Sequence, residues 1–488
     1  MLWPRWIFLR ALGLIFLSAF WSLASEVQGL IGPRGLLPAG EYLEAVSRAL
    51  PSLRAYWAAP TLLWLGSGRI ALSALVWSGL ACSLLLTLNL WPRLACALCT
   101  VLFLSFVAAA QDFSGYQSDG MLLEAGFISI FFAPRGLRPG LGAADPPPRL
   151  AWFLLVWEWL RIYVESGVVK LLSGDLQWRT LTALDHYYEY LPLPTWIGWY
   201  VQHLPHGFHA ACVVAVFVFE LALAWLAFAP RPLRLACFFL VSPFQAVIIL
   251  TANYAFLNYI VLALGVLLLD DAFLRKAGLR TPEIAAVPRH PAFRWAGNVA
   301  LGWVLVATLA VAPTVARHLW RPLLWPAIAL EPFRIANPYG LFAVMTEERL
   351  EIEFQGSQDG VTWVAYPFRH KPQDPLVAPG IYAPYQPRFE WNLWFAALAD
   401  WRQYPWVLVV EGRLLEGEPS VLRLFAGDPF GGVPPARVRS VLWEYQFTSL
   451  AEKRATGAWW KRRERGLLAP PLQRGTDGRI RAYGPGVE

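Results

Sequence analysis

The first two thirds of the chain consist of long apolar runs separated by connections that hold most of its polar residues. A helix needs about 20 residues to cross the hydrocarbon core of a bilayer, and most of these runs approach that length. We therefore expect a polytopic α-helical membrane bundle of about nine spans, of which the fourth is too short for a full crossing. The nine runs are residues 6–23, 70–90, 94–110, 120–132, 150–172, 208–229, 233–252, 254–269 and 296–315.

The pattern changes after residue 325. Leu350, Ile352 and Phe354 alternate with two glutamates, which is typical of a half-buried strand. Further strands are expected at residues 361–368, 407–410 and 421–425, and a helix at residues 389–398. We therefore predict two domains, a transmembrane helical domain at 1–325 and a β-rich extramembrane domain, folded as a β-sandwich, at 326–488.

Composition supports the membrane assignment. Hydrophobic residues make up 57% of the 488 residues and charged residues 15%, whereas a soluble domain has about 25% charged residues. The formal net charge of +7 arises in the membrane half, because acids and bases nearly balance from Glu331 onward. We therefore expect membrane lipids and no nucleic acid as partners. All five cysteines fall inside apolar runs and none follows Cys237, so the second domain has no disulfide.

The basic residues of the connections predict the orientation, because cytoplasmic loops carry an excess of Lys and Arg. With the N-terminus inside, the cytoplasmic segments contain Arg5, Arg10, Arg93, Arg135, Arg138, Arg149, Arg231, Arg234, Arg275, Lys276, Arg280, Arg289 and Arg294. The opposite segments contain only Arg34, Arg48, Arg54, Arg69 and Arg179. An odd number of spans then places everything after Arg317 outside the cytosol, in a lumen or a periplasm.

Charged residues inside the membrane runs are candidates for a site. Glu158, Arg161 and Glu165 are spaced i, i+3 and i+7 and share one face of the fifth run. Each charge costs at least about 2.5–3.5 kcal/mol at the centre of a membrane helix, so they should be paired and face inward. A structural ion-pair cluster and a functional site both explain them. Glu124 and Glu220 lie in other runs, and either could pair with Arg161 or line a cavity.

Lys170, near the end of the fifth run, is the first of only five lysines in the chain. An amine can lose its proton in an apolar setting, whereas a guanidinium cannot. A lysine in an arginine-biased chain therefore indicates a position that needs the amine. Anchoring in the lipid headgroups is the alternative.

An outward loop at 173–205 follows Lys170 and is too apolar for a plain linker, so we expect it to pack across the mouth of the bundle. Its aromatic and polar residues form a second candidate site. The members of this site are Trp178, Arg179, Asp185 and His186.

His203, His206 and His209 repeat at three-residue spacing, which could gather a metal ion. Pro205 interrupts that stretch and no carboxylate or cysteine lies close in sequence, so histidines at the membrane interface are the favoured interpretation. No nucleophile elbow, P-loop or dinucleotide fingerprint occurs. We expect no metal and no cofactor, and the residues alone name no reaction.

Seven distinctive segments follow one another along most of the chain. They include YQSDGMLLEAGF at 116–127 and PRFEWNLWFAAL at 387–398. The others are residues 166–175, 178–184, 337–346, 356–363 and 456–460. Together these segments resemble the lipase maturation factor family.

That resemblance implies a non-enzymatic membrane factor that helps secreted homodimeric lipases reach an active fold in the endoplasmic reticulum. A chaperone-like, client-binding role would then belong to the outer domain and the outward loops. The candidate client-binding residues are Trp391, Trp394, Trp459 and Trp460. The Arg-rich chain without glycosylation sequons is typical of a bacterial protein, for which the cytoplasmic membrane and the periplasm would be the compartments.

A more distant resemblance favours an enzyme. The stretch 163–171, with Ser166-Gly167 followed by Lys170-Leu171, is similar to part of the transmembrane module of vitamin K-dependent carboxylase. A lysine at the matching place acts as the base in that enzyme, although Val169 replaces the first lysine of its pair. The alternative function is therefore a membrane enzyme that uses Lys170 as a base on a lipid or a quinone.

Overall fold

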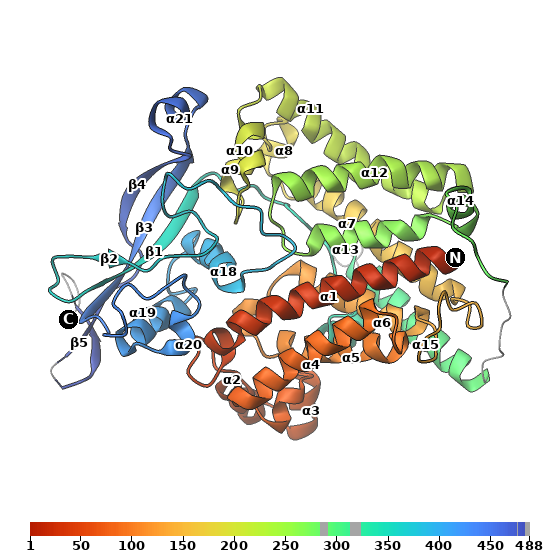
Figure 1. The fold of residues 1–488 in the computed structure, drawn as a ribbon, viewed down its shortest axis with the longest axis horizontal. Helices are drawn as coiled ribbons and strands as arrows, with labels where there is room; N and C mark the ends of the chain where they lie inside the picture. The colour runs from red at the N-terminus through yellow and green to blue at the C-terminus, as the bar shows by residue number, and fades with distance from the viewer. Residues whose placement is uncertain (284–290, 313–323, 476, 484–488) are drawn as a thin grey trace.

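The computed structural model describes residues 1–488 except 284–290, 313–323, 476 and 484–488. The described chain has a helical bundle and a domain built on a β-sheet, which lies at the end of the bundle far from the N-terminus (Figure 1). Of the expected features, Arg289, Arg317 and the end of the ninth run at 313–315 lie outside the described residues.

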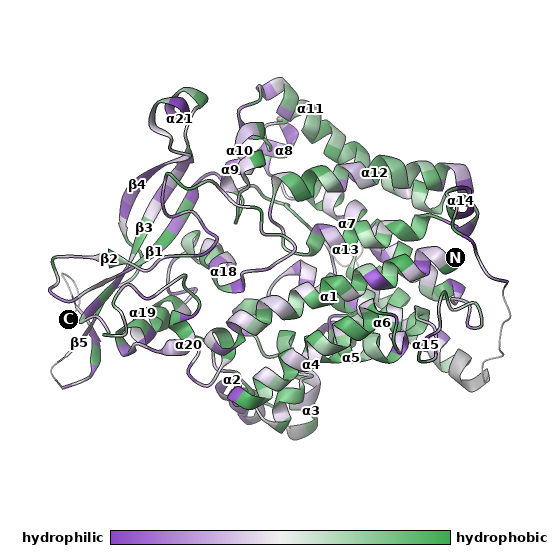
Figure 2. Cartoon of the chain, in the orientation of Figure 1, coloured by the Kyte–Doolittle hydropathy of each residue, from purple (hydrophilic) through white to green (hydrophobic). Residues whose placement is uncertain are grey.

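Four helical segments of the described chain are long and apolar enough to cross a membrane. Hydrophobic residues cover most of their length in Figure 2. The first, α1, passes beside α4 and beside α20 (Pro419–Leu422) of the sheet domain, so it runs the length of the bundle. The four segments are α1 (Leu2–Ile31), α4 (Arg69–Thr87), α11 (His206–Phe217) with its continuation to Phe228, and α12 (Arg231–Thr251).

The other expected runs also form helices, but these are shorter or carry more charge, so the number of spans stays a prediction. They are α5 (Pro92–Val107), α6 (Gln117–Phe132), α7 (Arg149–Leu172), α13 (Leu257–Gly265) with η5 (Val266–Leu268), and α15 (Pro291–Val311). Short helices join them: α2 (Ala39–Ala49), α3 (Ser52–Ala58), η1 (Leu62–Leu65), η2 (Gln111–Ser114), α8 (Leu176–Arg179), α9 (Tyr187–Tyr190), α10 (Trp196–Gln202) and α14 (Asp271–Lys276).

The continuation of α11 is irregular. A π-helical turn, η3 (Val218–Ala222), follows α11 directly and leads into the 3₁₀ segment η4 (Leu223–Phe228). One extra residue in a turn rotates the side chains that follow, and such turns are frequent at functional sites. Here the turn contains Glu220, which faces the interior.

The bundle end that holds the N-terminus is rich in arginines bound to nearby loops. Arg5 donates to the carbonyl oxygens of Leu141 and Gly142 at 2.9 and 2.8 Å. Arg93 and Arg135 pair with Asp145 at 3.2 and 3.1 Å. Because the sheet domain lies at the other end, the arginine-rich connections and that domain are separated by the length of α1 (Figure 1).

The C-terminal domain contains one antiparallel six-stranded sheet in the order β2-β1-β3-β5-β6, with β4 paired to β3. Strands β1 and β3 pair along nine residues, from Arg349 opposite Tyr445 to Ser357 opposite Arg437. The strands are β1 (Arg349–Ser357), β2 (Val364–Ala365), β3 (Arg437–Phe447), β4 (Trp460–Leu467), β5 (Leu472–Arg474) and β6 (Ile480–Ala482).

The expected β-sandwich is wrong for the described residues, because helices rather than a second sheet pack against the strands. The segment 407–410, expected as a strand, lies in α19 (Trp406–Glu416). Of the expected strand 421–425, the first two residues end α20 and the other three form a turn. Valine and leucine fit either element when a short apolar run is read alone. The expected helix at 389–398 is confirmed. The helices are α18 (Arg388–Ala397), α19 (Trp406–Glu416), α20 (Pro419–Leu422) and α21 (Leu450–Thr456).

The alternation predicted a strand that is buried on one face only. Strand β1 is instead buried along its whole length, on both faces. Arg349 and Lys371 both pair with Glu351, and Arg462 pairs with Glu353 at 3.2 Å. The glutamates alternate with apolar residues because one face meets the core and the other meets these basic partners. The returning strand expected at 361–368 is limited to β2.

Segment 324–346 belongs with the bundle more than with the sheet, although the expected boundary lay at 325. Helix α17 (Trp325–Leu330) packs on α15, and the indole of Trp303 donates to Pro326 O at 3.0 Å. A 3₁₀ turn, η7 (Glu331–Phe333), follows, and the chain then enters the bundle at Asn337.

Candidate functional site

Glu124 on α6 and Arg161 on α7 form a buried ion pair. Both side chains are almost completely enclosed, with 1% and 3% exposed. Arg161 also donates to the main-chain oxygen of Asn337 at 2.7 Å. Glu124 accepts the side-chain amide of Asn337 at 3.2 Å and the hydroxyl of Tyr339 at 2.9 Å. A segment that leads into the sheet domain therefore covers the ion pair and hydrogen-bonds to both of its members.

The same segment binds one carboxylate oxygen of Glu165. Its carboxylate accepts the main-chain N–H of Tyr339 at 2.7 Å, and the guanidinium of Arg161 lies 5.0 Å from the Tyr339 ring centre. The chain after α17 thus fills the space that Glu124, Arg161 and Glu165 could otherwise have lined. This part of the charged cluster is a packed, ion-paired junction.

Glu158 lies beside Glu124 and Arg161 and has no exposed surface. Neither of its carboxylate oxygens has a well-formed hydrogen bond among the described residues. An unsatisfied buried carboxyl is costly, so this residue is the least explained member of the cluster.

A second junction, which the sequence did not reveal, joins α18 to the bundle. Arg388 binds the carboxylate of Asp119 through two hydrogen bonds of 2.7 and 2.8 Å. It also donates to Phe113 O, and its main-chain N–H donates to Glu26, each at 2.8 Å. Arg388 and Asp119 are at most 1% exposed. Bidentate arginine–carboxylate pairs fix orientation as well as distance, so α18 is held in one position on the bundle.

The outward loop is fastened to the sheet by Arg349. Its guanidinium donates to the main-chain oxygens of Glu189, Leu191 and Pro192 and pairs with Glu351. Burial raises the pKa of the Glu189 carboxyl to about 7. The loop is thus a structural connection between the two parts of the molecule.

Lys170 takes part in neither junction. Its ammonium group donates to both oxygens of Glu220 on η3, at 2.8 and 2.9 Å, and lies 5.2 Å from the ring centre of Trp178. The side chains of Lys170 and Glu220 are 2% and 11% exposed. The structure therefore divides the expected polar cluster, with Glu124, Glu158, Arg161 and Glu165 in one place and Lys170 in another.

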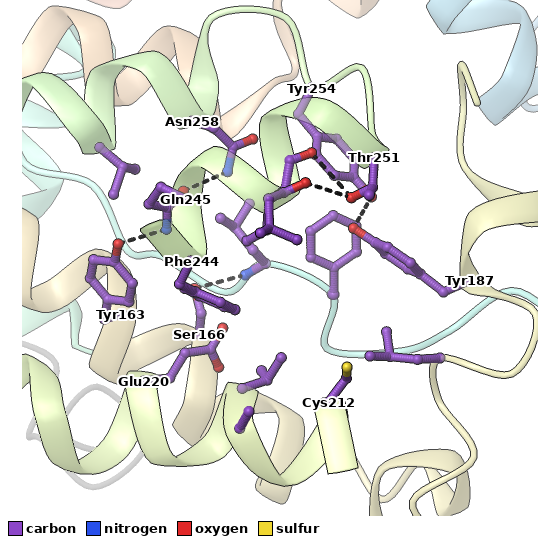
Figure 3. Close-up of a pocket in the computed structure, with 18 of the residues that line it drawn as sticks. Tyr163, Ser166, Tyr187, Cys212, Glu220, Phe244, Gln245, Thr251, Tyr254 and Asn258 are labelled. Atoms are coloured by element: carbon purple, nitrogen blue, oxygen red, sulfur yellow. Dashed lines mark hydrogen bonds between the residues drawn. The ribbon is translucent and has the colours of Figure 1, made fainter. Parts of the chain in front are cut away.

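The Lys170–Glu220 pair lies in the wall of a cavity of about 180 Å³ between α7, the α11–η4 segment, α12 and α13. Figure 3 shows a chain of polar side chains on the wall opposite Glu220. In this chain Gln245 donates to the hydroxyl of Tyr163 at 2.6 Å and accepts from Asn258 at 2.8 Å. The outer end is covered by the outward loop, which contributes Trp178, Leu184, Tyr187 and Tyr188.

The four candidate residues of the outward loop do not form one site. Trp178 is buried and donates to Phe342 O at 3.0 Å. Arg179 is exposed. Asp185 pairs with His206 at 3.0 Å, while His186 is exposed and stacks on Tyr190. Only Trp178 contacts the cavity.

The three histidines also lie apart. His203 contacts the main-chain oxygens of Trp199 and Thr448 at 2.7 and 2.9 Å, and His206 pairs with Asp185. His209 is buried without a hydrogen-bond partner in the part of the chain that the structure describes. The described part of the chain contains no group of three or more His, Cys, Asp or Glu side chains that could hold a metal ion.

The tryptophans expected to bind a client are largely internal. Trp391 packs on Tyr116 and Trp460 on Phe447, and both are buried. Trp394 and Trp459 are half-buried. Of the four, only these two offer surface to another protein in this structure.

The apolar helices, with a sheet domain at one end of the bundle, define an integral membrane protein. Comparison with known proteins identifies the family. The chain matches the lipase maturation factor transmembrane domain over residues 3–276 and the lipase maturation factor C-terminal domain over residues 335–470. The chain belongs to the lipase maturation factor family.

Individual relatives agree with this assignment. The chain is 32% identical to lipase maturation factor 2 of Gallus gallus, over 94% of this chain and 80% of the relative. It is 31% identical to lipase maturation factor 1 of Mus musculus and of Homo sapiens, over 96% of this chain and 87% of each relative. No solved structure matches the chain.

The segments that resemble the family meet one another in space. Asp119 and Glu124 come from 116–127, Asn337 and Tyr339 from 337–346, and Arg388 from 387–398. All five belong to the two buried junctions. The most distinctive sequence of the chain is thus used to join the bundle to the C-terminal domain.

Proposed function

We propose that this protein assists the maturation of a secreted lipase-like client, which it meets with its C-terminal domain on the non-cytoplasmic side of the membrane. The observation that carries the proposal is the family match over both parts of the chain. The relatives are named as lipase maturation factors. The compartment would be the endoplasmic reticulum lumen in a eukaryotic cell and the periplasm in a bacterium.

The arrangement of charge supports this orientation. The arginine-rich connections lie at the bundle end that holds the N-terminus, and the sheet domain lies at the other end (Figure 1). Basic connections favour the cytosol. The sheet domain would then face the compartment through which secreted proteins pass.

Two features of the C-terminal domain suit contact with a folding protein. Leu376 and Val377 are each 61% exposed. The half-buried Trp459 lies close to these two residues in space, since its main-chain N–H donates to Pro375 O at 2.8 Å. Exposed apolar residues beside an aromatic ring can contact apolar surface that an unfinished client has not yet buried.

The test is a maturation assay in cells that lack their own maturation factor. We expect the full chain to raise the activity of a co-expressed secreted lipase, measured per amount of lipase antigen. We expect Arg388→Gln, which breaks the α18 junction, to abolish most of this gain. Arg402→Gln is the matched control, because Arg402 forms an exposed ion pair with Asp400 in the same domain. No gain from the full chain with any secreted lipase would contradict the proposal.

A second candidate function is catalysis in the bundle with Lys170 as base. The observation in its favour is that Lys170 and Glu220 both line the cavity. Lys170→Arg keeps a positive charge but removes the amine that could titrate. Full function of this variant in the maturation assay would exclude the catalytic role, and loss with normal expression would support it.

A further inference from the structure

The cavity beside Lys170 is open on the side of the bundle that faces lipid. Helix α12 packs closely against η4, where the two segments form a hairpin. Farther from that hairpin, α11 and α12 are not closely packed against each other. These two segments are also the least buried of the four long apolar helices, since only 22% and 17% of the residues in their apolar stretches are buried. Val247 on α12 lines the cavity and is 57% exposed. A molecule that enters between α11 and α12 therefore comes from the bilayer.

The polar groups of the wall are already paired with one another. Lys170 and Glu220 neutralise each other, and both oxygens of Glu220 accept from Lys170. The hydroxyls of Tyr187 and Tyr254 are 2.9 Å apart. The remaining lining is mainly aliphatic and aromatic. A charged ligand would have to separate the ion pair, whereas an apolar ligand leaves every polar contact intact.

The size of the cavity suits a small apolar group. A buried apolar cavity of about 150 Å³ is large enough to bind benzene. The volume here is about 180 Å³ and continues to the protein surface. It can hold several methylene groups of a chain whose remainder stays in the bilayer.

We propose that this cavity binds an aliphatic chain of a membrane lipid, inserted sideways between α11 and α12. The chain would contact Phe244 and Val216 near the opening and approach Tyr163 and Tyr254 at the back. This binding requires neither a client nor chemistry at Lys170, so it is independent of the proposed function.

The test uses the full-length protein in phosphatidylcholine vesicles that contain a phosphatidylcholine with a photoreactive diazirine in one acyl chain. A parallel sample contains the free fatty acid with the same diazirine. After irradiation, mass spectrometry locates the labelled residues. Tyr163 and Tyr254 are 3% and 5% exposed, so surrounding lipid does not reach them. Trp225 and Phe239, both 52% exposed, report labelling by that surrounding lipid.

Matched variants distinguish the cavity from the surface. Val247→Trp narrows the opening, and Val214→Trp places the same side chain on α11 at a residue that is 47% exposed and does not line the cavity. Ala215→Trp and Ala246→Trp form a second pair, in which only Ala215 lines the cavity. Both valines are exposed, so the first pair tests the proposal even where Ala215→Trp fails to fold.

We expect label on the peptides of Tyr163 or Tyr254 in the wild type. This label falls several-fold in Val247→Trp or Ala215→Trp and stays near the wild-type level in the control variants. Label from phosphatidylcholine identifies a bilayer lipid, and label from the free acid alone identifies a fatty acid; both support chain binding. Label confined to exposed residues such as Trp225, or unchanged internal label in both cavity variants, would overturn the proposal.

Discussion

Three buried ion pairs hold charged side chains inside the bundle and at its junction with α18. Arg161 meets Glu124, Lys170 meets Glu220 and Arg388 meets Asp119, each pair almost fully enclosed. The sequence indicated that charges in apolar runs need partners, because an unpaired charge there is costly. It could not choose the partners, since Glu124 and Glu220 were equivalent candidates for Arg161 until the helices were placed in space.

Removing one member of the Lys170–Glu220 pair should be far more harmful than removing both. We expect Glu220→Gln to lower the free energy of unfolding by about 3–5 kcal/mol, because the ammonium of Lys170 is then buried without a counter-charge. The double variant Lys170→Met/Glu220→Leu should recover most of that loss. The measurement is unfolding by SDS in mixed micelles.

Glu416→Gln is the control for this comparison, because Glu416 forms a partly exposed pair with Arg413. Its loss should stay below about 1 kcal/mol. Equal losses in the free energy of unfolding for Glu220→Gln and Glu416→Gln would show that the buried pair contributes no more to stability than the exposed one.

Glu411 predicts a pH dependence of stability in the C-terminal domain. It is completely buried on α19 beside Ser440, and burial raises the pKa of its carboxyl from 4.5 to about 8. Between these two values the folded state holds a proton that the unfolded chain releases. Stability from this group is therefore full below about pH 4.5 and falls as the pH rises toward 8.

We expect Glu411→Gln to remove this decline and to exceed the wild type in stability at pH 8, by roughly 2–4 kcal/mol. Thermal unfolding of the full chain between pH 5 and pH 8 measures it. Glu416→Gln on the same helix should keep the wild-type profile. A wild-type protein that grows more stable from pH 5 to pH 8 while Glu411→Gln stays flat would contradict the assignment.

At the scale of elements, the lengths of the apolar runs predicted the bundle better than local apolar patterns predicted the sheet domain. Every long apolar run coincides with a helix in the described chain, because a membrane helix must satisfy its own backbone hydrogen bonds. In the C-terminal domain, Val407 to Val410 lies in α19 and not in a strand. Four apolar residues in a row fit a buried helix face as well as a strand. The partners of β1 could not be found from sequence, because pairing with β3 spans about 90 residues of chain.

The position of α18 depends on Arg388. We expect Arg388→Gln to release α18 from the bundle, since it removes the two bonds to Asp119 and the bond to Phe113. Limited proteolysis of the purified full chain should then cut between the bundle and the C-terminal domain much faster than in the wild type.

The exposed Arg402→Gln should leave the cleavage pattern unchanged. Arg388→Lys should be intermediate, because an ammonium keeps the charge but loses the two-pronged geometry. Identical cleavage of Arg388→Gln and the wild type would mean that α18 is held by apolar packing alone.

At the scale of the whole molecule, the bundle and the sheet domain form one object joined by buried charge. Segments that are far apart in sequence, 116–127, 337–346 and 387–398, meet at the junctions. The sequence predicted both parts and their order but placed the boundary at 325, whereas the structure keeps the chain up to about 346 against the bundle. Prolines mark the end of a helix but do not show where the following chain packs, so the boundary at 325 stays a prediction.

The central claim is that the C-terminal domain and the N-terminal end of the bundle face opposite sides of the membrane. Single cysteines at two exposed positions test it, Val361→Cys on the sheet domain and Arg138→Cys at the arginine-rich end, in a background with Cys212→Ser. A membrane-impermeant maleimide is applied to sealed vesicles whose non-cytoplasmic face is outside. We predict that Val361→Cys reacts and that Arg138→Cys reacts only after detergent is added. Reaction of Arg138→Cys in sealed vesicles, with Val361→Cys protected, would contradict the account.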